Sequence, residues 1–202
     1  EFWVNADMTA EAAARYVDMG FTAVKFDPAG PYTIRGGHEP AMSDITRSVE
    51  FCRKIREAVG DRADLLFGTH GQFTTPGAIR MGRELEPYNP LWYEEPIPPD
   101  NLLEFAEVAR QVRIPLATGE RLTTKAEFGT LLRAGGVKIL QPALGRLGGI
   151  MEAKKVAAIA EIFNADEGRP LRAWRSGCSK SHPVIFWPAI QPSVQQNHLL
   201  DS

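Results

Sequence analysis

Short apolar segments recur along this sequence about every 25 residues, each separated from the next by a stretch with helical periodicity. They begin near residues 63, 91, 114 and 137, after an earlier segment at 21–27. A helical stretch at 43–59 illustrates the spacing, with one apolar stripe formed by Ile45, Val49, Cys52, Ile55 and Val59. Strands that are apolar throughout are buried on both faces, which is typical of parallel sheets covered by helices. The repeat therefore predicts alternating strands and helices around a parallel sheet.

Two architectures share this alternation, an open doubly wound sheet and a closed barrel. No GxGxxG sequence follows a predicted strand, so the dinucleotide-binding form of the open sheet has no support. The barrel is therefore favoured. About five strands are recognisable, whereas a full barrel has eight. We expect a partial (β/α) TIM-type barrel in residues 1–164 and an irregular tail in residues 165–202, where only 184–187 has the composition of a short strand.

Charge and hydropathy restrict the class of partner. The formal net charge is −2, with both signs interspersed, so there is no basic face for nucleic acid and no polybasic patch for a membrane surface. No stretch approaches the roughly 20 consecutive apolar residues of a membrane span. These features predict a cytoplasmic protein that binds a small molecule, with a homo-oligomer left open.

Acidic residues follow two neighbouring strands of the predicted barrel. Glu94 ends the strand at 91–94, and Glu120 ends the strand that begins near 114. The carboxyl ends of parallel barrel strands meet at one face, so the two carboxylates would converge and repel each other unless a cation lay between them. Hard carboxylate oxygens suit Mg²⁺. The plainer alternative is that Arg121 simply pairs with Glu120.

Two further polar residues belong to the same predicted face. His70 follows the strand at 63–69, and Lys25 lies within an otherwise apolar strand. A lysine in such a place is seldom buried without a partner or a purpose. His38, in a glycine-containing loop, is a weaker candidate, and His182 and His198 in the tail are weaker still.

The motifs around these residues resemble a known family. They are GFTAVKFDPAGPY, FGTHGQF with the later YEEP, IPLATGERL, and ILQPALGRLGGIMEAKK. Together they are similar to the barrel of the mandelate racemase and muconate-lactonizing enzyme branch of the enolase superfamily, and within it to the galactonate dehydratase-like acid sugar dehydratases. The resemblance covers residues 3–164 and implies a barrel without the N-terminal capping domain.

By this resemblance, Glu94 and Glu120 match two of three Mg²⁺ ligands, and His70 matches a general acid. Lys25 matches the first lysine of a Lys-x-Lys pair, and Asp27 stands where the second lysine would be. The implied reaction removes the proton α to the carboxylate of an acid sugar and then eliminates the β-hydroxyl as water. Lys25 is the best remaining base.

The sequence also departs from the family pattern. Gly68 replaces the first metal-ligand aspartate, Ala143 replaces an aspartate that orients a second histidine, and that histidine is missing after Asn164. We therefore expect weak Mg²⁺ binding, poor packing in residues 166–202 and little activity from this chain by itself. A racemase or epimerase on the same scaffold, and an inactive barrel fragment or pseudoenzyme, are the alternatives.

Overall fold

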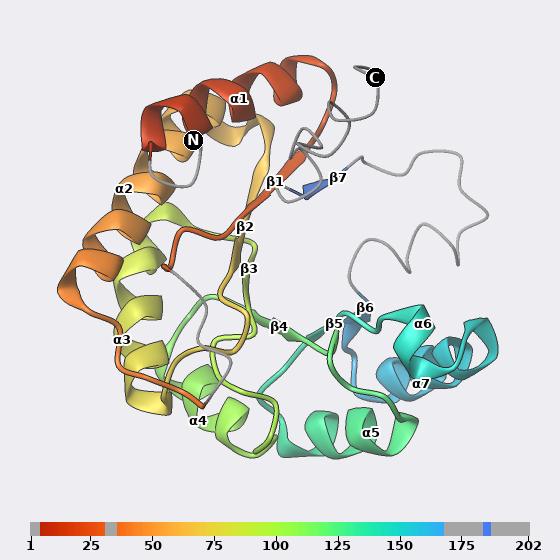
Figure 1. The fold of residues 1–202 in the computed structure, drawn as a ribbon. Helices are drawn as coiled ribbons and strands as arrows, with labels where there is room; N and C mark the ends of the chain where they lie inside the picture. Colours follow the sequence, from red (N-terminus) through yellow and green to blue (C-terminus); the bar gives the residue numbers. More distant parts are fainter. Residues whose placement is uncertain (1–4, 31–35, 168–183, 187–202) are drawn as a thin grey trace, which may run out of the picture.

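The fold is a curved parallel sheet with helices along its outer side. The computed structural model describes residues 5–30, 36–167 and 184–186. Every strand pair is parallel, and the strands follow the order β6-β5-β4-β3-β2-β1-β7. Figure 1 shows the helices outside the arc of strands. This is the partial TIM-type barrel that the sequence predicts.

Strands and helices alternate as the apolar repeat indicates. The strands are β1 (Ala23–Phe26), β2 (Asp64–Gly68), β3 (Trp92–Glu94), β4 (Leu116–Thr118), β5 (Ile139–Leu140), β6 (Asp166–Glu167) and β7 (Val184–Phe186). The helices are α1 (Ala6–Asp18), α2 (Met42–Val59), α3 (Thr75–Leu85), α4 (Glu104–Gln111), α5 (Lys125–Ala134), α6 (Leu144–Leu147) and α7 (Ile150–Ile162), with short 3₁₀ turns at Gly60–Arg62 and Glu86–Tyr88.

Strands β1 to β5 pack their alternate residues into two separate cores. The larger core lies between the sheet and the helices and includes Phe67 and Tyr93. The smaller one gathers on the inner side of the arc and consists of Ala23, Leu66, Trp92, Ala117 and Ile139. Because strand side chains alternate with a period of two, the residues two places further along face the inner side as well. These are Lys25, Gly68, Glu94, Gly119 and Gln141, all near the carboxyl ends of the strands.

Local signals explain the boundaries of two helices. The helical stretch at 43–59 begins one residue earlier, because α2 starts at Met42 with Ala41 as its cap, where the Asp44 carboxylate accepts from the Ala41 N–H at 3.3 Å. Gly148 and Gly149 both have positive φ, 95° and 93°, and they separate α6 from α7.

Two short strands come from the segment predicted to be an irregular tail. β6 pairs with β5 through Ile139↔Asp166, and β7 pairs with β1 through Ala23↔Val184. They lie at opposite ends of the described sheet (Figure 1). Residues 168–183 and 187–202 lie outside the described part of the chain, so the predicted packing of the tail and the boundary at residue 164 remain predictions.

None of the helices in the described part of the chain combines the length and the apolar character that crossing a bilayer requires.

Candidate active site

An ion pair joins Lys25 and Glu94 on the inner side of the sheet. The Nζ of Lys25 donates to Oε1 of Glu94, and both side chains are almost fully buried. The other carboxylate oxygen, Oε2, accepts from Trp92 Nε1 at 3.1 Å and from Gln141 Nε2 at 2.9 Å. Every oxygen of this buried carboxylate therefore has a donor, as a buried charge requires. The cation that neutralises Glu94 here is the ammonium of Lys25.

His70 lies between two carboxylates. Its Nε2 is 2.7 Å from Oδ2 of Asp27, and its Nδ1 is 3.9 Å from Oε1 of Glu120. Burial alone would lower the pKa of His70, but the hydrogen bond to Asp27 and the negative charges of Asp27 and Glu120 outweigh it and raise the pKa. The imidazole therefore holds its proton to a higher pH than an ordinary histidine does.

The buried carboxylate of Glu95 is linked to the backbone of His70 through Arg121. Glu95 is almost completely buried, and its Oε2 accepts from Arg121 Nε at 3.0 Å. Arg121 Nη2 also donates to the carbonyl oxygen of His70 at 3.1 Å. Burial raises the pKa of Glu95, although Arg121 opposes the shift. The suggestion that Arg121 simply pairs with Glu120 is therefore wrong, because Arg121 pairs with Glu95.

The backbone at these strand ends is bent into the left-handed region. His70 has φ 52° and Glu95 has φ 43°, both rare for residues with a side chain. The Gly71 N–H donates to the Glu95 carbonyl at 2.6 Å, and Thr69 Oγ1 donates to the same carbonyl at 2.7 Å. At Gly71, a Cβ would lie 1.9 Å from Arg121 Nη2, so only glycine leaves room for the guanidinium. These contacts set the direction of the His70 side chain.

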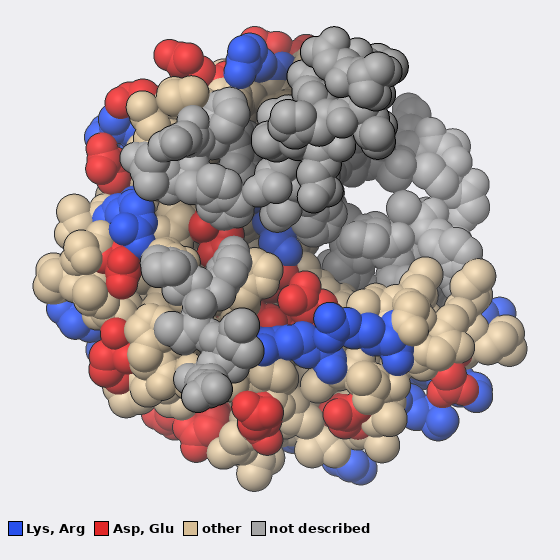
Figure 2. All heavy atoms as spheres, viewed as in Figure 1, with Lys and Arg blue, Asp and Glu red and all other residues tan. Residues whose placement is uncertain are grey.

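The structure brings Lys25, His70, Glu94 and Glu120 to the same edge of the sheet. Lys25 pairs with Glu94, and its charge also acts on His70. Asp27, which the sequence placed where a second lysine would be, pairs with His70. The residues that were not proposed as site residues are Trp92, Glu95, Arg121 and Gln141. Figure 2 shows acidic and basic side chains close together near the middle of the face toward the viewer.

The carboxylates of the described residues do not form a ready Mg²⁺ site. Among the residues that the structure describes, no three His, Cys, Asp or Glu side chains are grouped so that they could hold a metal ion. Glu94 is already neutralised by Lys25, and Gly68 offers no ligand beside it. The described residues therefore offer no set of three such ligands, and Mg²⁺ binding by Glu94 and Glu120 stays a prediction.

His38 has a structural role at the same end of the molecule. Its N–H donates to the Gln72 carbonyl at 2.9 Å, and its ring contacts that of Phe73 edge-on, with the ring centres 5.5 Å apart. The contacts fasten the loop at 36–40 to the segment after His70. His182 and His198 lie outside the described residues.

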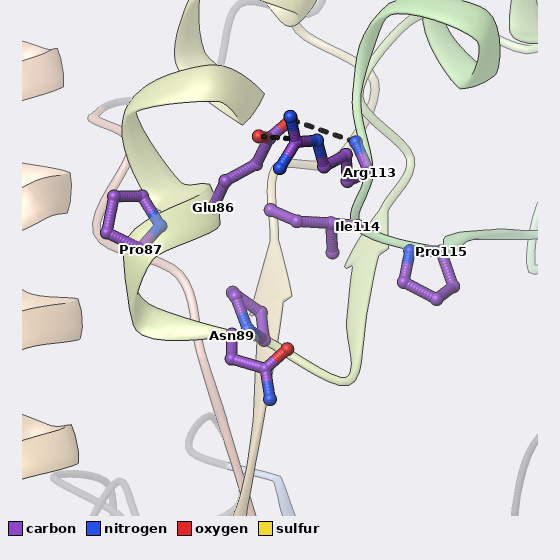
Figure 3. Close-up of a pocket in the computed structure, with 7 residues that line it drawn as sticks. Glu86, Pro87, Asn89, Arg113, Ile114 and Pro115 are labelled. Carbon is purple, nitrogen blue, oxygen red and sulfur yellow. Dashed lines mark hydrogen bonds and ion pairs between the residues drawn. The ribbon is translucent and has the colours of Figure 1, made fainter.

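Two cavities lined by described residues lie at opposite ends of the strands. One of about 410 Å³ is lined by Glu86, Pro87, Asn89, Pro90, Arg113, Ile114 and Pro115, just before β3 and β4 begin (Figure 3). The other, of about 290 Å³, is lined by Phe73, Ile97 and neighbouring loop residues after the ends of β2 and β3. Only the second lies on loops that continue from the polar strand ends. The larger cavity is therefore remote from the candidate chemistry.

Fold and site together define a member of the enolase-type barrels. Residues 7–168 match the family model described as "Enolase C-terminal domain-like", and the chain belongs to this family. A mandelate racemase/muconate lactonizing enzyme-like protein from Roseovarius sp. TM1035 is 74% identical to this chain in the aligned part, which covers 81% of this chain and 41% of that one, with a TM-score of 0.80.

Curated relatives of lower identity carry names of acid sugar dehydratases. The D-gluconate/D-galactonate dehydratase of Picrophilus torridus is 40% identical over 160 residues, which cover 79% of this chain and 40% of the relative. The D-xylonate dehydratase of Haloferax volcanii is 37% identical over 163 residues, with the same coverage of each chain. The chain thus spans about two-fifths of the length of these relatives. The resemblance identified in the sequence is confirmed.

Proposed function

We propose that this chain carries the proton-transfer residues of an acid sugar dehydratase. The observation that carries the proposal is the setting of His70, which is hydrogen-bonded to Asp27, lies beside Glu120 and has a raised pKa. Loss of a hydroxyl group as water needs an acid that is still protonated near neutral pH. Relatives named as dehydratases at 34–40% identity support the same class of reaction.

The reaction converts a 2,3-dihydroxy acid into a 2-keto-3-deoxy acid and water. A base removes the proton from the carbon α to the carboxylate, and the electron pair of that bond forms the carbon–carbon double bond of an enol. The bond between the β carbon and its hydroxyl oxygen breaks. His70 supplies a proton to the departing oxygen, which leaves as water, and the enol tautomerises to the ketone.

Lys25 is the base that we assign to the first of these steps. A lysine accepts a proton only as the neutral amine, and its charge state responds readily to its surroundings. In the ion pair Lys25 is an ammonium, so it acts as the base only after its proton passes along this hydrogen bond to Glu94, which leaves a neutral amine beside a neutral carboxyl group. We assign no step to Mg²⁺, because Glu94 is paired with Lys25 and Gly68 supplies no ligand.

A screen of acid sugars against the full 202-residue chain tests the proposal. Because little activity is expected from this chain by itself, the expected result is slow formation of a 2-keto-3-deoxy product from at least one acid. The rate should fall a further 10²- to 10⁴-fold, roughly, in His70→Gln, the usual range for loss of a general acid. His38→Gln is the control, because it keeps the backbone N–H that bonds to Gln72 and loses only the ring contact with Phe73, and it should retain the wild-type rate. Absence of product from every acid, or equal rates in His70→Gln and wild type, would refute the assignment.

A further inference from the structure

Asp27 and His70 form a tight pair across two neighbouring strands. Asp27 directly follows β1, and His70 lies two residues beyond the end of β2. The separation of 2.7 Å between Nε2 and Oδ2 is that of a charge-assisted hydrogen bond. The Asp27 side chain is 6% exposed, whereas that of Glu120, on the other side of the ring, is 40% exposed. Asp27 is thus both the closer and the more deeply buried of the two carboxylate partners of His70.

Both members of the pair are held in place. Asp27 packs over Gly68, where a Cβ would lie 3.5 Å from Oδ2 of Asp27. The His70 backbone is fixed by the hydrogen bond from Arg121 Nη2 to its carbonyl and by its left-handed φ of 52°. A ring whose backbone and whose acceptor are both restrained has little freedom to turn over.

The contact distinguishes the two ring nitrogens. Asp27, as a carboxylate, only accepts, so Nε2 must carry the hydrogen. Nδ1 is 3.9 Å from Glu120, which exceeds hydrogen-bond length. The partner of one imidazole nitrogen determines which nitrogen exchanges protons.

We propose that Asp27 is a positioning residue that fixes neutral His70 as the Nε2–H tautomer and so directs proton transfer through Nδ1. Asp27 itself does not touch the substrate. The inference rests on the proposed role of His70 as the acid, and it adds which nitrogen delivers the proton and which residue selects it.

Nitrogen-15 NMR of the full chain tests the tautomer without any need for activity. Long-range ¹H–¹⁵N correlation of the uniformly labelled protein, recorded at a pH where imidazoles are neutral, distinguishes the protonated from the unprotonated ring nitrogen. His70→Gln identifies the signals of His70 among the four histidines. We expect Nε2–H in the wild type and a mixture of tautomers in Asp27→Ala. Asp44→Ala, which removes a carboxylate paired with Arg47 on α2, should leave the His70 signals unchanged.

Steady-state kinetics on the acid found by the screen give the second readout. Asp27→Ala should lower kcat about 10²-fold with little change in KM, because the imidazolium loses the carboxylate that holds its Nε2–H and directs its Nδ1–H toward the departing oxygen. An Nδ1–H tautomer in the wild type, or an unchanged tautomer in Asp27→Ala, would overturn the inference. If the wild type shows Nε2–H but turns over no acid, the proposed function fails while the positioning role of Asp27 stands.

Discussion

Lys25 and Glu94 form an ion pair that passes over a strand lying between them. Lys25 belongs to β1 and Glu94 to β3, while β2 pairs with both. The residue of β2 in register with Glu94 is Gly68, and a Cβ there would lie 3.5 Å from Cε of Lys25. Gly68 thus leaves the space over which the lysine reaches the carboxylate. The absence of a side chain at this position and the presence of the ion pair are parts of the same arrangement.

Replacing Lys25 should lower the free energy of unfolding, because it leaves the buried charge of Glu94 unpaired. Lys25→Met leaves Glu94 without its cation in a site where the carboxylate is only 5% exposed. Breaking a buried ion pair from one side costs about 3 to 5 kcal/mol. Denaturant unfolding should therefore show a loss of this size, and Lys25→Met with Glu94→Gln should recover most of it. A loss below about 1 kcal/mol for Lys25→Met, as for an exposed pair, would contradict the burial of the pair.

A carboxylate introduced at position 68 by Gly68→Asp should create a better metal site. The nearest atoms to a Cβ at this position are at 3.5 Å, an ordinary contact, so the side chain fits. An aspartate there would compete with Glu94 for Lys25 and would add hard oxygen ligands, which largely set affinity for Mg²⁺. Calorimetry should show Mg²⁺ binding at least about tenfold tighter in Gly68→Asp than in the wild type.

The matched variant for this experiment is Gly68→Asn, which has nearly the same shape but no charge. It should bind Mg²⁺ no better than the wild type. Equal affinity in all three proteins would show that position 68 does not contribute to a metal site.

The apolar repeat predicts the sheet well, because burial of strands on both faces leaves a strong pattern in the sequence. It also places Lys25, His70, Glu94 and Glu120 at one edge, since parallel strands share the direction of their carboxyl ends. The partners of these residues are not predictable in the same way. Whether Arg121 meets Glu95 or the adjacent Glu120 depends on the positive φ of Glu95 and on the turn after β4, which periodicity does not report.

Asp27 shows the same limit for the site itself. Its position after an apolar strand was visible in the sequence, but its contact with His70 depends on the left-handed turn at His70 and on the room above Gly68. The sequence shows that Gly68 replaces a carboxylate of the family pattern. That Gly68 also leaves room for Lys25 to reach Glu94 follows only from the register of three strands.

Arg121 should contribute stability that depends on pH through Glu95. Arg121→Gln removes the cation from a buried carboxylate and the donor to the His70 carbonyl, at a cost of about 1 to 3 kcal/mol near neutral pH. The folded-state pKa of Glu95 is raised by burial, so the stability linked to this group is present at low pH and is lost as the pH rises through that pKa. Loss of Arg121 raises this pKa further.

The loss of unfolding free energy in Arg121→Gln should therefore become smaller as the pH falls and Glu95 becomes protonated in both proteins. Urea unfolding of the variant and the wild type between pH 4 and pH 8 measures this difference. Arg110→Gln, which removes an exposed arginine paired with Glu107, should change stability by less than about 0.5 kcal/mol. A deficit that grows toward low pH would contradict the assigned pairing of Arg121.

The rate of dehydration should persist beyond the ordinary titration range of histidine. The acid form of His70 is lost as the pH rises through its pKa, and Asp27 and Glu120 raise that pKa although burial opposes them. The descending limb of kcat should therefore lie above pH ~6.5, the unperturbed value for histidine. A limb centred below that value would assign the acid to another group.

Exchange in heavy water tests the role of His70 as the acid most directly, because it separates removal of the α proton from loss of the hydroxyl. The acid identified by the screen is incubated in D₂O with wild type and with His70→Gln, and mass spectrometry follows both deuterium in the recovered acid and the keto acid product. We predict that the wild type forms the 2-keto-3-deoxy acid, whereas His70→Gln incorporates deuterium at the α carbon but forms product about 10²- to 10⁴-fold more slowly. Product formation at the wild-type rate by His70→Gln, or α-exchange without loss of water in the wild type, which is the behaviour of a racemase, would contradict the account.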